Sequence, residues 1–98
     1  MRTLLRITIP VEAGNKGVQD GTIQRVMAET MERLRPEAAY FFAERGTRAG
    51  LFVFDLKDSS DVPSIAEPFF AGLNAAVEFT PVMNAEDLKK GLERVSRK

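Results

Sequence analysis

Two aromatic-rich runs lie near the centre of the chain, at residues 38–44 and 49–56, and only four residues separate them. One of these four residues is Gly46. A short connection that contains glycine, placed between two such runs, predicts a β-hairpin. The remaining elements must therefore pack onto an antiparallel pair of strands in the middle of the chain.

The segment before the hairpin predicts a strand and a helix. Residues 4–9 alternate between two faces, which is typical of a strand, and residues 11–16 form a turn-rich connection. Residues 17–35 carry apolar side chains at helical spacing. Gly21 weakens the first turns of that helix by about 1 kcal/mol relative to alanine, so we expect the helix to begin late.

The segment after the hairpin repeats this pattern in reverse order. A helix begins at Ser60 or Asp61, whose side chains are good N-caps, and we expect Pro68 to kink or shorten it. A strand follows at residues 75–80. Asn84 then caps a short C-terminal helix.

The resulting order is strand, helix, strand, strand, helix, strand and a terminal helix. With right-handed crossovers, this order predicts an α+β ferredoxin-like βαββαβ sandwich with a four-stranded antiparallel sheet. Both main helices then lie on one face of the sheet. The 98 residues are enough for a single domain, which spans 1–98.

One sheet face stays uncovered in this fold, although its strands are not polar on either side. We expect Leu5, Ile7 and Ile9 to lie under the helices. The opposite face is then predicted to carry four aromatic side chains, Tyr40, Phe42, Phe52 and Phe54. An exposed aromatic patch usually marks an interface or a ligand groove, so we expect a homodimer formed through this face.

These features resemble the dimeric α+β barrel superfamily, in which two ferredoxin-like subunits pack sheet against sheet. The likeness covers nearly the whole chain as length, element order and two-faced strands. The stretches 36–41 (PEAAYF) and 66–70 (AEPFF) are also similar to those of a small group of uncharacterised bacterial proteins. The superfamily includes monooxygenases that need no cofactor and muconolactone isomerase, so the resemblance implies a homodimer with chemistry of one of these kinds.

Five residues are candidates for ligand binding: Arg6, Tyr40, Phe52, Phe54 and Glu78. Neighbouring first and fourth strands place Arg6 beside Glu78, where they form either a polar anchor for a substrate or a structural ion pair. Tyr40 either hydrogen-bonds a ligand carbonyl or acts as an interface residue. No residue is assigned a catalytic role.

Two other groups of charged residues have simpler explanations. Arg45 and Arg48 flank the hairpin tip and could bind an anion, but a solvated turn is the better explanation for both. Asp55, Asp58 and Asp61 surround one loop, yet their spacing is not that of an EF-hand.

The composition excludes several classes of function. The chain has no cysteine and no histidine, so we expect no zinc, haem or iron–sulfur site and no cofactor. Its formal net charge is zero, which does not favour nucleic acid. No apolar stretch approaches the roughly 20 residues of a membrane span. Arg6 interrupts the N-terminal apolar run too early for a signal peptide, so by elimination we expect a cytoplasmic protein.

The sequence therefore leaves two functional hypotheses open. The first is a homodimer that binds a small, partly apolar molecule between sheet and helices, with catalysis of the cofactor-free isomerase or monooxygenase type. The alternative is a non-catalytic assembly or interaction module whose open sheet face serves only dimerisation. A pocket with convergent polar groups favours the first hypothesis, and a fully filled face favours the second.

Overall fold

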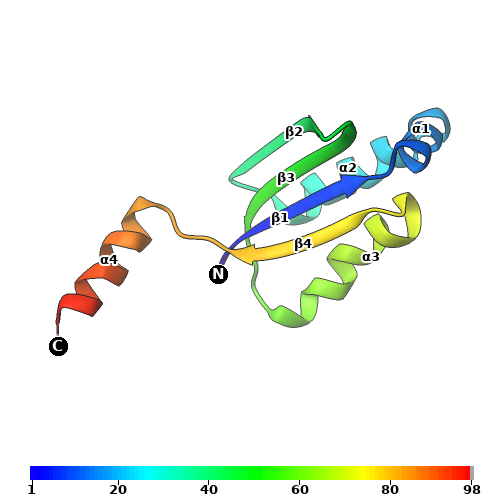
Figure 1. Ribbon diagram of the computed structural model, residues 1–98. Helices are drawn as coiled ribbons and strands as arrows, with labels where there is room; N and C mark the ends of the chain where they lie inside the picture. The colour runs from blue at the N-terminus through cyan, green and yellow to red at the C-terminus, as the bar shows by residue number, and fades with distance from the viewer. Residues whose placement is uncertain (98) are drawn as a thin grey trace.

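Four strands form one antiparallel sheet in the computed structural model, which describes residues 1–97 (Figure 1). The strands are β1 (Arg2–Ile9), β2 (Ala38–Glu44), β3 (Thr47–Asp55) and β4 (Ala76–Pro81). Their order across the sheet is β2-β3-β1-β4. The predicted hairpin joins β2 to β3 through Arg45 and Gly46, both with positive φ, as a two-residue turn of this kind requires.

Helices cover only one face of this sheet. Side chains of α2 (Thr22–Leu34) and α3 (Val62–Leu73) share one core with β1 and β3, and α1 (Val11–Asp20) packs against both helices. A short 3-10 turn, η1 (Ser59–Asp61), precedes α3, and α4 (Ala85–Ser96) follows β4. The arrangement is the ferredoxin-like fold that the sequence predicts, with an additional C-terminal helix.

The turn expected at residues 11–16 is wrong, because this segment is the first half of α1. Gly14 and Gly17 are both buried. A Cβ added to Gly17 would lie 2.8 Å from the side chain of Ile23 and 2.9 Å from that of Leu73. Gly17 therefore allows α1 to pack closely against α2 and α3. The late start of the next helix is confirmed, since Gly21 has φ 82° and α2 begins at Thr22.

The start of α3 agrees only in part with the prediction. Asp61 occupies the N-cap position, as expected, but its side chain makes no capping hydrogen bond. The side-chain cap lies one element earlier, where the Asp58 carboxylate accepts a hydrogen bond of 2.9 Å from the Ser60 backbone N–H at the start of η1. The expected shortening at Pro68 is not found, since α3 continues to Leu73.

The faces of β3 are the main correction to the predicted core. Phe52 and Phe54 are 0% and 2% exposed and lie under the helices, whereas the sequence analysis placed them on the uncovered face. The register explains the difference, because Phe52 pairs with Leu5 and Phe54 with Thr3. Directly paired residues of neighbouring strands share a face. Leu5 and Thr3 are both buried on the helix side of the sheet, so both phenylalanine rings lie on that side as well.

The uncovered side of the sheet, called the open face below, is mixed in character. Alternation along the strands and the register place eight apolar side chains on it: Leu4, Ala38, Tyr40, Phe42, Ala49, Leu51, Val53 and Ala76. It also carries Arg6 and Glu78, which are directly paired. Tyr40 is 64% exposed. The open face therefore has two aromatic rings rather than the four predicted.

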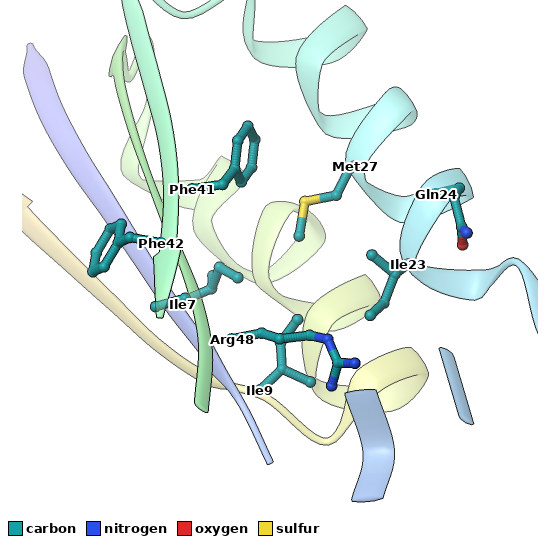
Figure 2. A pocket seen from close by; sticks show the side chains of 9 residues that line it. Ile7, Ile9, Ile23, Gln24, Met27, Phe41, Phe42 and Arg48 are labelled. Atoms are coloured by element: carbon teal, nitrogen blue, oxygen red, sulfur yellow. The ribbon is translucent and has the colours of Figure 1, made fainter. Parts of the chain in front are cut away.

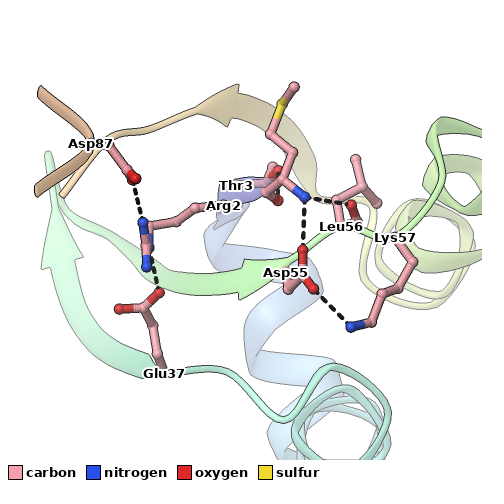
Figure 3. Close-up of polar contacts among 8 residues, drawn as sticks. Arg2, Thr3, Glu37, Asp55, Leu56, Lys57 and Asp87 are labelled. Atoms are coloured by element: carbon pink, nitrogen blue, oxygen red, sulfur yellow. Dashed lines mark hydrogen bonds and ion pairs between the residues drawn. The ribbon is translucent and has the colours of Figure 1, made fainter. Parts of the chain in front are cut away.

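Helix α4 stands apart from the sheet and the other helices (Figure 1). Its predicted cap is confirmed: the Asn84 side chain accepts a hydrogen bond of 2.8 Å from the Asp87 N–H, and the Asp87 carboxylate accepts one of 3.2 Å from the Asn84 N–H. Arg2 at the start of β1 pairs with Asp87 and with Glu37 (Figure 3). These contacts fix only the first turn of α4, and none of its residues is buried.

Candidate functional site

A cavity of about 540 Å³ lies between α2 and the β2-β3-β1 side of the sheet (Figure 2). We call it the α2 cavity. Its lining consists of Ile7, Ile9, Ile23, Gln24, Met27, Phe41, Phe42, Arg48 and Ala49. This volume falls within the range of small-molecule sites, roughly 300–1,000 Å³.

The walls of the α2 cavity are mostly apolar. Ile7 and Ile9 of β1 form the floor and are each 1% exposed, and Met27 and Ile23 of α2 face them (Figure 2). Phe41 closes the side formed by β2 and is 56% exposed. Such a surface suits the hydrocarbon part of a ligand, because burial of apolar area contributes about 25 cal/mol per Å².

The position of Phe41 depends on a glycine in the neighbouring strand. Gly50 pairs directly with Phe41, and a Cβ added to Gly50 would lie 3.0 Å from the ring. The Phe41 ring also meets Phe52 edge-on, with a centroid separation of 5.7 Å and an interplanar angle of 80°. This geometry is favourable for two aromatic rings, so β3 holds Phe41 in place along the cavity wall.

Within residues 1–97, Arg48 is the only charged residue that lines the α2 cavity. Its guanidinium lies over α1, where the missing side chain of Gly14 leaves room for it, and it donates a 3.2 Å hydrogen bond to Asn15 Oδ1. Arg48 forms no ion pair with any other residue in the 1–97 range. Four of the five N–H donors of a guanidinium are thus not engaged by Asn15, and an anionic group is their natural partner.

The polar residues predicted as ligand anchors lie elsewhere. Arg6 and Glu78 are paired across β1 and β4 on the open face, as expected. However, the ion-pair partner of Arg6 is Glu44 of β2, and the Arg6 guanidinium lies 5.4 Å from the centroid of the Phe42 ring. Tyr40 lies in the same cross-strand row as Arg6. None of these three lines the α2 cavity, and Phe52 and Phe54 belong to the core.

The sequence suggested anion binding by Arg48 but favoured a solvated turn at this position. The residue in fact belongs to β3, which begins at Thr47. In a strand, residues two apart share a face, so Arg48 lies on the same side as Phe52. The alternation of side chains along β3 would have placed Arg48 on the helix side of the sheet, had the predicted strand begun two residues earlier, at Thr47.

The aspartates around the β3–α3 loop have partners of their own. Asp55 accepts hydrogen bonds of 2.7 Å from Lys57 and from the N-terminal amino group (Figure 3). These contacts, with Lys57 as the main cause, lower the pKa of Asp55 to about 2. Asp58 caps η1. Within residues 1–97, three or more side chains of metal-ligating type do not come together at one point.

Comparison with known proteins gives no functional assignment for this chain. No protein-family model matches this chain, and no curated protein matches it in sequence. Among the helices that the structure describes, none has both the length and the apolar character needed to cross a membrane.

Proposed function

We propose that this protein binds a small amphipathic molecule in the α2 cavity, with an anionic group on Arg48 and an apolar portion against Ile23, Met27 and Phe41. The observation that carries the proposal is that Arg48, which has no ion-pair partner within residues 1–97, lines a cavity whose other lining residues are apolar except for Gln24. A ligand with one negative group and a hydrocarbon body complements both parts of this site.

The lining supports binding more strongly than catalysis. None of the nine residues lining the cavity is a carboxylate, tyrosine, histidine or cysteine, so the cavity offers no general base near neutral pH. Chemistry of the cofactor-free isomerase or monooxygenase type therefore has to rely on the reactivity of the ligand, with Arg48 stabilising negative charge that develops on it.

Matched ligand pairs test the proposal. We expect octanoate to bind at least tenfold more tightly than 1-octanol, because a charge-assisted hydrogen bond contributes about 1.5–3 kcal/mol and about 1.4 kcal/mol is a factor of ten. Calorimetry gives the affinities, and methyl chemical shifts of Ile23 and Met27 report the location. The Arg48→Met variant should lose the preference for the carboxylate.

Arg45→Met is the matched control, since it removes the same charge from the adjacent hairpin turn and does not line the cavity. It should bind octanoate as the unmodified protein does. Equal losses in the two variants, or octanoate binding without shifts of Ile23 and Met27, contradict the proposed site.

A second proposal concerns assembly, and the open face favours it. We infer that the protein is a homodimer that buries this face, the oligomeric state that the resemblance to dimeric α+β barrels implies. The supporting observation is that Leu4, Leu51 and Val53 lie on a face that no helix of the same chain covers, next to a largely exposed Tyr40. Light scattering at micromolar concentration should give twice the chain mass, and a monomer mass contradicts this assembly.

A further inference from the structure

Helix α4 presents an apolar stripe to solvent. Leu88, Leu92 and Val95 are 46%, 59% and 63% exposed, and their spacing of four and three residues puts them on one side of the helix. Isolated helices shorter than about 12–15 residues are marginal in water, and α4 has 12 residues. Such a helix gains stability mainly by packing its apolar side against another surface.

Contacts with β1 fix the first turn of α4 in an orientation that directs the helix away from the sheet of its own chain. The Val82 N–H donates a 3.1 Å hydrogen bond to the Arg2 carbonyl, which extends β4 alongside β1. Arg2 then pairs with Asp87 in the first turn of α4 (Figure 3). From this root α4 projects away from the rest of the chain (Figure 1). It therefore does not cover the open face of its own copy.

The open face and α4 match in size and in character. Twelve residues make a helix about 18 Å long, and four strands about 4.8 Å apart span roughly 15 Å. Leu4, Leu51 and Val53, each half-buried, provide an apolar surface for the stripe.

The charges complement each other as well. Glu78 lies on the open face beside this apolar surface, and Lys89 flanks the stripe of α4. Neither of them has an ion-pair partner in the part of the chain that the structure describes. A lysine at the edge of a docked α4 would meet the carboxylate of Glu78.

We propose that α4 is an exchanged arm: it lies across the open face of a second copy of this chain, and the α4 of that copy returns the contact. Two-fold symmetry makes the exchange reciprocal and closes the assembly at two subunits. The proposal rests on the homodimer proposed above and states what fills its interface. The open face is covered by the partner's helix, not by the partner's sheet.

Photo-crosslinking of the full chain tests this arrangement. Because the chain has no cysteine, Leu92→Cys carries a benzophenone maleimide label at a single position. The labelled protein is mixed with ¹⁵N-labelled unmodified protein, allowed to exchange, and irradiated. We expect crosslinked peptides that join position 92 to ¹⁵N peptides of β1 or β3. The matched control is Lys90→Cys, on the opposite side of α4, which should give at least tenfold less of this product.

Each outcome separates the arm from the dimer. Crosslinks to the partner's β1 or β3 support the exchange. A dimer mass by light scattering, with crosslinks to other segments or none, overturns the arm and leaves the dimer intact. A monomer whose crosslinks stay within one copy overturns both proposals.

A variant without a label gives an independent measurement. Leu92→Glu should raise the dimer dissociation constant at least tenfold, whereas Lys90→Glu, a larger change in charge on the other side of α4, should raise it less than threefold. Equal effects of the two variants contradict the arm. Far-ultraviolet circular dichroism confirms that both variants keep the fold, which is expected because neither position is buried.

Discussion

Arg33 of α2 donates a hydrogen bond to a backbone carbonyl of α3 that Pro68 leaves without a helical partner. A proline has no N–H, so the carbonyl four residues before it loses its helical hydrogen-bond partner. That carbonyl belongs to Ser64, and it accepts a 3.1 Å hydrogen bond from Arg33 Nη1. Arg33 Nη2 also donates a 2.6 Å hydrogen bond to Ser64 Oγ. The long side chain of one helix thus completes the hydrogen bonding of its neighbour, which explains why α3 continues through Pro68.

Arg33→Met should lower the free energy of unfolding by about 0.5–1.5 kcal/mol, the net contribution of a typical hydrogen bond. In a Pro68→Ala background the same change should cost less, because the alanine N–H again bonds the Ser64 carbonyl. Denaturant titrations of the four proteins give the coupling between the two positions.

Arg25→Met serves as the control in the same helix. Arg25 forms an exposed ion pair of 3.7 Å with Glu29, and such pairs contribute little. Its loss should change stability by less than about 0.5 kcal/mol. If Arg33→Met costs the same with proline and with alanine at position 68, Arg33 has no role in compensating for the proline.

At the scale of the elements, β3 shows why register matters more than alternation. Alternation separates Phe52 and Phe54 from Leu51 and Val53, but it does not say which set faces the helices. The pairing of Phe52 with Leu5 decides this, and a shift of one residue would exchange the two faces. The larger side chains fill the space under α2 and α3, where Phe52 also contacts Phe69 at a centroid separation of 6.4 Å.

Alanine substitutions in β3 test this assignment. Phe52→Ala should destabilise the fold by about 3–5 kcal/mol, since it opens a cavity in the core. Leu51→Ala on the open face should cost less than half as much in the monomeric state. Thermal and denaturant unfolding of both variants give the comparison. A larger loss for Leu51→Ala contradicts the orientation of the strand.

The same scale shows how much of the fold the sequence could predict. Hydrophobic periodicity, the glycine turn at Gly46 and the cap at Asn84 were enough for the element order and the ferredoxin-like fold. Helix α1 was missed, because Gly14 and Gly17 are typical of turns until their contacts with neighbouring elements are known. The α2 cavity was expected only in outline, and Arg48 was assigned to a solvated turn because its position depends on where β3 begins. These features depend on pairing between distant segments, which local patterns do not contain.

The shape of the whole molecule differs from that of a typical small domain. Its radius of gyration is 15.7 Å, whereas a compact chain of this length has one of about 12.6 Å. The longest dimension is 56 Å against 28 Å and 18 Å for the others. The projecting α4 accounts for the elongation (Figure 1). A single copy therefore leaves a helix and a sheet face uncovered within residues 1–97, and the proposed dimer would cover both.

The thermal stability of the protein should therefore depend on its concentration. When folding is coupled to dimerisation, unfolding separates two subunits and mass action raises Tm as the protein becomes more concentrated. A tenfold change in concentration corresponds to about 1.4 kcal/mol. For an assembly of about 200 residues, this shifts Tm by roughly 3–5 °C. Calorimetric scans between 5 and 500 μM measure the shift, and Leu92→Glu should reduce it, because a weaker arm lets the subunits separate before they unfold. A Tm that stays constant over this range means that the subunits unfold independently, and the open face and α4 then contribute nothing to the stability of the folded chain.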